Sequence, residues 1–233
     1  MYDRTPKKKR YYNLVASLPA FRPLNDNKDL PLTRIHLERR LRFLSATDTA
    51  LIDAIVDTFA SHRLESSEAY LKRVKKLKTD LKNHTVPLLN EITTYLLRER
   101  ALISLMRIKT ADRPVENFEA WRPMLGEISS SVERNWKKPV FGLQKLFPHL
   151  TKVEQAINEN NPKDVEHHLV KNNWRYLTDR AFEADTQFTL ESVAIYVLRW
   201  HLLRRWIYRK PEESLNIIND ELDTIVEQTE LKI

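Results

Sequence analysis

Two groups of basic residues have the types and spacing to bind a partner. The first lies near the C-terminus and interleaves cations with aromatic rings, in the order Arg199, Trp200, Arg204, Arg205, Trp206, Tyr208, Arg209, Lys210. Guanidinium groups pair with carboxylates or phosphates, and aromatic rings can stack on bases. Leu203 and Ile207 continue an apolar stripe at helical spacing, so we interpret the tryptophans as core residues. We predict that Arg199, Arg204 and Arg205 border this core and contact a partner protein.

The second group crowds one predicted helix and comprises Lys72, Arg73, Lys75, Lys76, Lys78 and Lys82. A helix face of this kind can be a solvated surface, or can bind an acidic protein, anionic lipid head groups or RNA. These alternatives stay open from the sequence. Lys72, Lys75 and Lys76 are the predicted partner-binding residues of this helix.

Side chains suited to catalysis are present but scattered. The seven histidines include one adjacent pair, His167 and His168, whose side chains would point about 100° apart on a helix. The carboxylates fall mostly on polar helix faces, and Ser129–Ser131 are better suited to capping a helix than to acting as nucleophiles. No cysteine is present for a disulfide or a thiolate ligand. We therefore expect no catalytic residue, metal ligand or cofactor, and predict that the protein is not an enzyme.

The low glycine content limits both function and fold. Only Gly126 and Gly142 occur, and neither stands near a Lys-Ser or Lys-Thr pair. A phosphate-binding loop and a dinucleotide fingerprint are therefore excluded. Tight hairpin turns also need residues with positive φ, whereas turns between helices can use Pro, Asn and Asp. The composition favours an all-α fold.

Apolar residues recur at helical spacing along the chain. The clearest stripe predicts a helix over about 46–60, with Ser45 and Asp48 forming a capping box at its start. A longer helix is predicted over about 86–109, with Arg98, Glu99 and Arg100 filling much of its polar surface. Other stripes are Leu37, Leu41 and Leu44 after a Thr33 cap, and Tyr70, Val74, Leu77 and Leu81.

Apolar spacing and capping residues also predict helices in the C-terminal third. Asn161 and Pro162 begin one, whose buried stripe is Val170, Trp174, Leu177 and Ala181. Thr189 is predicted to cap the next, where residues 193–198 are apolar on all sides and therefore central to the core. A last amphipathic helix carries Leu215, Ile218, Leu222 and Ile225. The predicted fold is an all-α multi-helix bundle.

Composition divides the 233 residues into four segments. Residues 1–10 form a basic arm, which we interpret as solvated rather than as a secretory or nuclear signal. Residues 11–110 form an N-terminal helical half and residues 151–233 a C-terminal half. Between them, residues 111–150 hold four prolines and both glycines and are predicted to be an irregular joint. No apolar stretch approaches the roughly 18 residues of a membrane span, and the lack of cysteine suggests the cytoplasm.

Three stretches resemble one family. Residues 11–19, Tyr-Tyr-Asn-Leu-Val-Ala-Ser-Leu-Pro, look like the opening of a poorly characterised family encoded with bacterial V/A-type rotary ATPases. Leu30-Pro31-Leu32-Thr33 and Leu44-Ser45 with Asp48 resemble its next motifs. Near the other end, the similar residues are Asp164-Val165-Glu166, Trp174-Arg175-Tyr176-Leu177, Phe188, Glu191, Tyr196 and Arg205-Trp206. The likeness covers about the first fifty residues and residues 155–210.

The resemblance implies a C/d-like subunit of the central stalk. Such a subunit is a cup or funnel of small helical bundles that links the rotor shaft to the membrane proteolipid ring. It would be peripheral on the cytoplasmic face of the inner membrane, without a small-molecule substrate. The basic arm precedes the expected start of the family, so no role is carried over to it. The main alternative from the charge pattern is a basic helical RNA- or DNA-binding protein. Some other helical scaffold also stays open, and a hydrolase fits least well.

Overall fold

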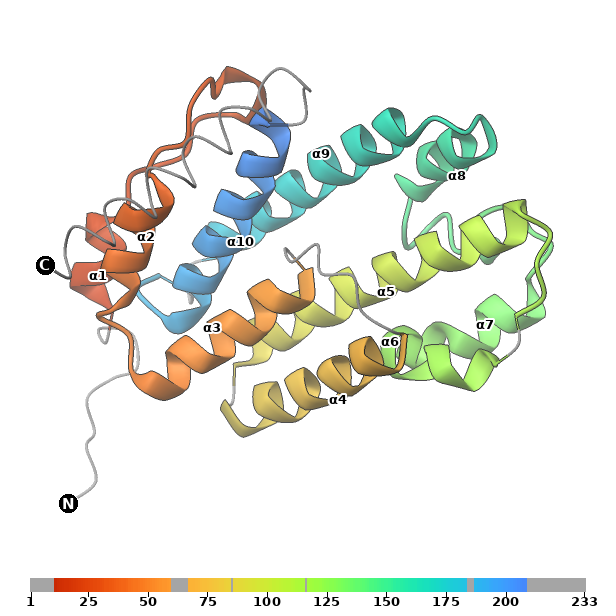
Figure 1. The fold of residues 1–233 in the computed structure, drawn as a ribbon, viewed down its shortest axis with the longest axis horizontal. Coiled ribbons are helices and arrows are strands. Elements are labelled where there is room, and N and C mark those ends of the chain that lie inside the picture. Colours follow the sequence, from red (N-terminus) through yellow and green to blue (C-terminus); the bar gives the residue numbers. More distant parts are fainter. Residues whose placement is uncertain (1–10, 60–66, 85, 116, 184–186, 209–233) are drawn as a thin grey trace, which may run out of the picture. The chain divides into compact units, whose positions relative to one another are not determined.

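Every regular element in the described part of the chain is a helix (Figure 1). The computed structural model describes residues 11–59, 67–84, 86–115, 117–183 and 187–208. The elements are α1 (Tyr12–Ser17), η2 (Leu24–Asp26), α2 (Arg34–Leu41), α3 (Ala46–Phe59), α4 (Ser67–His84), α5 (Pro87–Thr110), η3 (Phe118–Trp121), α6 (Arg122–Leu125), η4 (Gly126–Ile128), α7 (Ser129–Arg134), η5 (Pro139–Gly142), α8 (Leu150–Asn158), α9 (Pro162–Ala181) and α10 (Leu190–Ile207). The predicted all-α, multi-helix class is confirmed.

The predicted helix starts agree with the local chemistry. At α3, the backbone N–H of Asp48 donates to Ser45 Oγ at 3.2 Å, and the Ser45 hydroxyl donates to Asp48 Oδ2 at 2.7 Å. At α9, the N–H of Asp164 donates to Asn161 Oδ1 at 3.2 Å. Thr33 caps α2 through His36 N–H at 3.4 Å. Thr189 stands at the N-cap of α10, but its side chain makes no capping hydrogen bond.

The chain forms two compact units. The described residues of unit 1 fall within 11–49 and 178–208, and those of unit 2 fall within 50–177. The predicted joint, residues 111–150, lies wholly inside unit 2 and does not separate two halves. Four of the six prolines and glycines that suggested a break instead stand at the ends of short helices, namely Pro123, Gly126, Pro139 and Gly142. Pro114 and Pro148 lie in connections outside these helices. These short helices contribute core residues such as Leu125, Val132 and Phe141.

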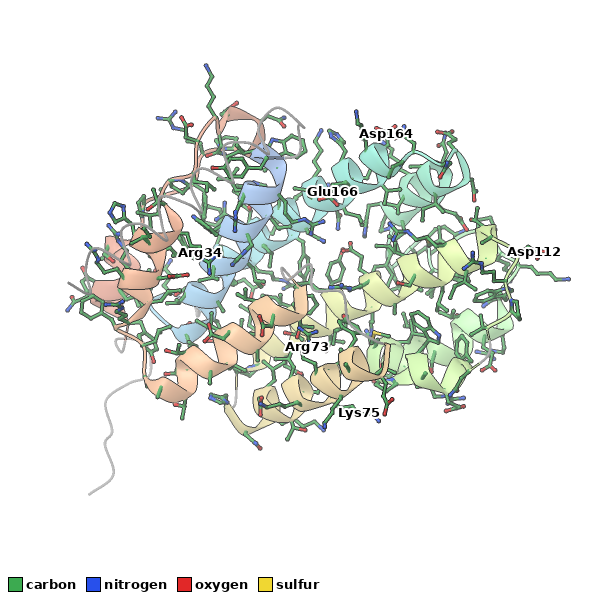
Figure 2. All side chains as sticks on the ribbon, in the orientation of Figure 1. Arg34, Arg73, Lys75, Asp112, Asp164 and Glu166 are labelled. Atoms are coloured by element: carbon green, nitrogen blue, oxygen red, sulfur yellow. The ribbon has the colours of Figure 1, made fainter. Side chains whose placement is uncertain are left out.

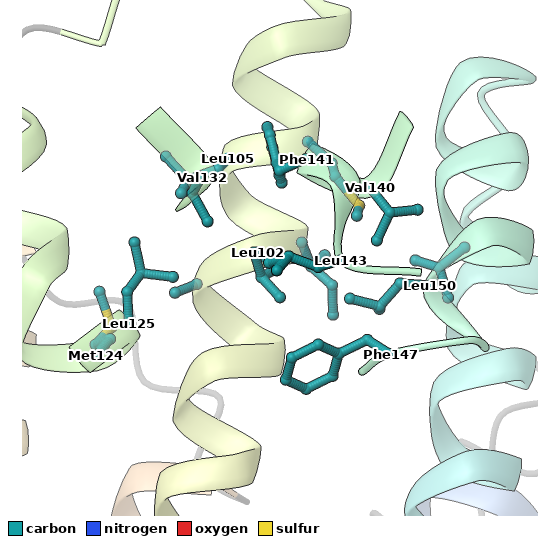
Figure 3. Packing of buried hydrophobic residues seen from close by; sticks show 14 of the residues in the cluster. Leu102, Leu105, Met124, Leu125, Val132, Val140, Phe141, Leu143, Phe147 and Leu150 are labelled. Atoms are coloured by element: carbon teal, nitrogen blue, oxygen red, sulfur yellow. The ribbon is translucent and has the colours of Figure 1, made fainter. Parts of the chain in front are cut away.

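Helix α5 is the centre of unit 2. It packs against α4, α6 and α8, and twelve of its residues are buried, including Leu97, Leu102 and Leu105. Figure 3 shows Phe141, Leu143 and Phe147 gathered around Leu102 of this helix. The three charged residues expected on the polar face of α5 are not all exposed. Glu99 is only 4% exposed and Arg98 is half-buried, while Arg100 is exposed as predicted.

A left-handed turn lies in η5. Val140, Phe141 and Gly142 have φ values of 46°, 52° and 73°. Glycine adopts this conformation freely, but a β-branched residue such as Val140 is strained in it. The buried Glu154 carboxylate holds the turn, because its Oε2 accepts from the Val140 N–H at 2.9 Å and its Oε1 pairs with Lys109 Nζ at 2.5 Å.

The core of unit 1 surrounds Trp200. This side chain is 1% exposed, packs with Leu32 and Leu37, and donates from Nε1 to the Leu32 carbonyl at 2.8 Å. The interpretation of Trp200 as a core residue is confirmed, as is the burial of most of residues 193–198. Trp206 is half-buried. The predicted basic arm, the helix carrying Leu215–Ile225, and Arg209 and Lys210 lie outside the described residues.

Candidate docking surfaces

The predicted docking arginines of α10 are all half-buried. The Arg199 guanidinium lies 4.7 Å from the centre of the Phe21 ring, and burial lowers the pKa of Arg199 to about 10. Arg199 therefore stays charged at neutral pH while its side chain packs within unit 1. The Arg204 guanidinium lies 6.0 Å from the Trp200 ring centre. Arg205 is also half-buried, so the three arginines lie at the border of the core, as expected. Their role in docking stays a prediction.

The predicted lysines of α4 lie on its outer face. Lys72, Lys75 and Lys76 are exposed, and Lys75 is labelled on α4 in Figure 2. The opposite face of α4 buries Val74, Leu77 and Leu81 in unit 2. This amphipathic division leaves the three ammonium groups accessible to an acidic partner.

Lys78 differs from its neighbours on α4. Its ammonium group donates to the Pro123 carbonyl, and burial, followed by repulsion from Arg98 and Lys82, lowers the pKa of Lys78. It helps to join α4 to α6 and is less accessible to a partner than Lys72, Lys75 and Lys76.

A shallow cavity beside α2, largely open to solvent, escaped the sequence analysis. Its volume is about 610 Å³, and it is lined by His36, Arg39, Arg40, Arg42 and Phe43. His36, Arg39, Arg40 and Phe43 follow the i, i+3, i+4, i+7 spacing of one helix face. These residues lie on a different helix face from the stripe of Leu37, Leu41 and Leu44. Only the apolar stripe was interpreted from the sequence.

The clearest buried polar cluster surrounds Glu99 in unit 2. Glu99 Oε1 lies 2.6 Å from His149 Nε2, and Glu99 Oε2 accepts from Asn173 Nδ2 at 2.6 Å. Asn172 Nδ2 donates to the Tyr95 hydroxyl at 2.9 Å and approaches Glu99 Oε1 at 3.4 Å. Both oxygens of the carboxylate are engaged by protein donors, so the cluster joins α5, α9 and the start of α8 rather than presenting an acid to a substrate.

Aromatic rings enclose this cluster. The Tyr95 ring stacks on Tyr176 at 4.0 Å between centres and on Phe147 at 5.5 Å. Burial, and next the Glu99 carboxylate, raise the pKa of the Tyr95 hydroxyl. Tyr95 is therefore neutral at physiological pH and serves as a hydrogen-bond partner of Asn172. Sequence reasoning missed the cluster because its hydrogen-bonded members are up to 77 positions apart in the chain.

Two features are absent from the described residues. No group of three His, Asp or Glu side chains in this part of the chain is arranged to hold a metal ion. None of the described helices combines the length and apolarity that a membrane span requires. Comparisons of the chain with protein-family models, with curated proteins and with solved structures find no match.

Proposed function

We propose that the protein is a non-catalytic, C/d-like coupling subunit of a bacterial V/A-type rotary ATPase. It would link the rotor shaft to the proteolipid ring and lie on the cytoplasmic face of the inner membrane through its partners. The proposal rests on the resemblance of its motifs to the family encoded with these motors. Its partners would be proteins, and its role mechanical.

The observation that carries the proposal is the meeting of three resembling segments in unit 1. The Tyr11 hydroxyl donates to the Asp48 carboxylate, which also accepts from Ser45 Oγ. The Tyr11 N–H donates to the Phe188 carbonyl at 3.3 Å, and the Tyr12 and Phe188 rings lie 4.7 Å apart between centres. Residues from the first, second and last resembling stretches thus contact one another in unit 1. We take these contacts as support for the proposal.

The accessible cations supply a means of docking. Lys72, Lys75 and Lys76 stand on an exposed helix face of unit 2, and the half-buried arginines of α10 border the core of unit 1. Arginines next to aromatic side chains often dominate protein interfaces. A coupling subunit needs such contacts, since it must transmit torque between two partners.

Affinity purification from native membranes tests the proposal. The tagged full chain is expressed in its own cells, the membranes are dissolved in mild detergent, and the captured proteins are identified by mass spectrometry. We expect rotor shaft subunits and the proteolipid to be recovered together with the chain. Recovery of RNA, DNA or ribosomal proteins in place of ATPase subunits would support the nucleic-acid alternative and refute the coupling role.

Charge variants then locate the docking residues. Arg204→Gln with Arg205→Gln removes two charges without burying new carboxylates, and Lys72→Glu with Lys75→Glu and Lys76→Glu reverses the α4 face. We expect at least one of these variants to lose roughly tenfold in recovered ATPase at low salt. Recovery by the wild type should itself fall as salt rises, because salt screens these charges. The control variant, Lys145→Glu with Lys152→Glu, changes two exposed lysines elsewhere in unit 2, and its change in net charge lies between those of the two test variants. Circular dichroism verifies that each variant is folded.

A further inference from the structure

The outer face of α2, together with the turn at Arg42 and Phe43 that follows it, combines positive charge with an exposed ring. The cavity of about 610 Å³ is lined there by His36, Arg39, Arg40, Arg42 and Phe43. Phe43 is 77% exposed, which is a high value for a large apolar side chain beside a cavity. Isolated exposed apolar residues are common, but one that lines a cavity among arginines offers both an apolar contact and charged contacts at one place.

Arg40, which lines the cavity, is held in position by hydrogen bonds within the protein. Arg40 Nε donates to the Ser17 carbonyl at 3.1 Å, and Arg40 Nη1 donates to the His36 carbonyl at 3.1 Å. On the opposite side of α2, Leu37 is buried with Trp200 in the core of unit 1. The helix is therefore fixed on its inner face and at Arg40, so a ligand would meet a largely preformed surface.

Arg39 and Arg42 carry the charge that remains available. Glu38 is the only acidic residue between positions 34 and 44, and Arg34 Nε pairs with it at 2.8 Å. Within the described ranges of the chain, no carboxylate forms an ion pair with Arg39 or Arg42, and both side chains are exposed. Carboxylates of a partner protein would form charge-assisted hydrogen bonds with these two arginines.

We propose that this face of α2 is a docking site for an acidic, amphipathic helix of a partner protein. An apolar side chain of that helix would rest against the Phe43 ring, and flanking carboxylates one turn apart would pair with Arg39 and Arg42. This is the helix-in-groove mode of recognition, in which apolar anchors give affinity and charges give orientation. The inference is independent of the rotary ATPase proposal, because it uses only the geometry and charge of unit 1.

Nucleic acid fits this surface less well. Helix α2 has eight residues and is therefore about 12 Å long, at about 1.5 Å per residue. The helix and the turn after it offer Arg39, Arg42 and the already bonded Arg40, which can neutralise about two or three phosphates. Affinity for nucleic acid grows with the number of phosphates neutralised, so these few contacts would give only weak binding. An acidic helix needs only two carboxylates and one apolar side chain at matching positions.

Fluorescence anisotropy tests the site with the full-length protein. The probe is a fluorescein-labelled peptide of roughly 14 residues, about four helical turns, with leucines on one face and glutamates on both flanks. A second peptide replaces every glutamate with lysine, and a third probe is single-stranded oligo-uridine. We expect saturable binding of the acidic peptide that weakens with salt, and at least roughly tenfold weaker binding of the other two probes.

Variants assign the binding to α2. Arg39→Glu with Arg42→Glu, and separately Phe43→Ser, are each expected to weaken binding of the acidic peptide by roughly tenfold or more. All three side chains are exposed, so the variants should keep the wild-type melting temperature. Lys145→Glu with Lys152→Glu, an equal change of charge on another surface, should leave the affinity within about twofold. The inference is overturned if the wild type does not bind the acidic peptide, if the α2 variants bind it as well as the control does, or if oligo-uridine binds more tightly.

Discussion

His149 Nε2 lies 2.6 Å from Glu99 Oε1 inside unit 2, although fifty residues separate the two side chains in the chain. This contact, together with the bonds from Asn172 and Asn173, fastens the start of α8 and the middle of α9 to the central helix α5. A carboxylate that is 4% exposed is tolerated there because these donors compensate for the loss of water.

Removal of the Glu99 carboxylate should destabilise the fold. Glu99→Ala leaves His149 and Asn173 without their buried acceptor, and each unsatisfied group costs about 1–3 kcal/mol, so we expect a total loss of about 3 kcal/mol or more. Urea unfolding measures the change. Glu127→Ala is the matched control, since the Glu127 side chain is 97% exposed, and it should cost less than about 0.5 kcal/mol. A similar cost for both variants would contradict the role given to the cluster.

Truncation of Trp174 should also be costly. Trp174 is 7% exposed and lies with Val170 and Leu177 on the buried face of α9. We expect Trp174→Ala to lower the free energy of unfolding by about 3–5 kcal/mol, as large truncations in a core do. Phe182→Ala, at a ring that is 79% exposed, provides the comparison. A loss below about 1 kcal/mol for Trp174→Ala would indicate that the tryptophan is not a core residue.

Acid should weaken unit 1 through His201. Burial, and next the charges of Arg204 and Arg34, lower the pKa of His201 from 6.5 to about 4. The unfolded chain therefore takes up this proton at a higher pH than the folded chain does. The free energy of unfolding is unaffected by His201 above about pH 6.5 and falls as the pH drops towards 4. The loss at pH 4 is about 1–3 kcal/mol, given about 1.4 kcal/mol per pKa unit and some solvent screening.

The variant His201→Gln isolates this effect, because glutamine does not titrate. Urea unfolding between pH 7 and pH 4 should show a smaller decline for the variant than for the wild type, with the difference confined to the range below about pH 6.5. Parallel curves for the two proteins would show that His201 is protonated equally easily in the folded and unfolded chains.

Glu154 should stabilise the left-handed turn of η5. Glu154→Ala removes the acceptor of the Val140 N–H and the partner of Lys109, so we expect a loss of about 2–4 kcal/mol. Glu154→Gln retains an oxygen acceptor and should recover part of this loss. Thermal unfolding ranks the two variants, and equal melting temperatures for them would mean that the charge, rather than the hydrogen bond to Val140, is what matters.

Local patterns explain which parts of the fold were predictable. The capping box of Ser45 and Asp48 is contained within four residues, and it correctly predicted the start of α3. Likewise, Asn161 and Pro162 marked the start of α9. The all-α class followed from such patterns repeated along the chain, together with the scarcity of glycine.

Contacts between distant segments explain what was missed. Whether Glu99 faces solvent depends on His149 and Asn173, which no pattern near position 99 reveals. The short helices of residues 111–150 were hidden by prolines and glycines, and their place in unit 2 depends on packing around α5. The predicted docking residues could be assigned to helix faces from their spacing alone. The cavity beside α2 could not be predicted in this way, because Arg42 and Phe43 in its lining belong to the turn after the helix.

The discontinuous composition of unit 1 bears on how the chain matures. Residues 50–177 are contiguous and precede α10, so all of unit 2 leaves the ribosome before α10 does. Trp200 must then reach the Leu32 carbonyl, a partner 168 positions earlier in the chain, and contacts between such distant segments form slowly. Until α10 is made, the apolar surfaces of Leu32 and Leu37 lack their central partner. Nascent chains that stall before position 200 would therefore expose these surfaces and become substrates for chaperones or proteases.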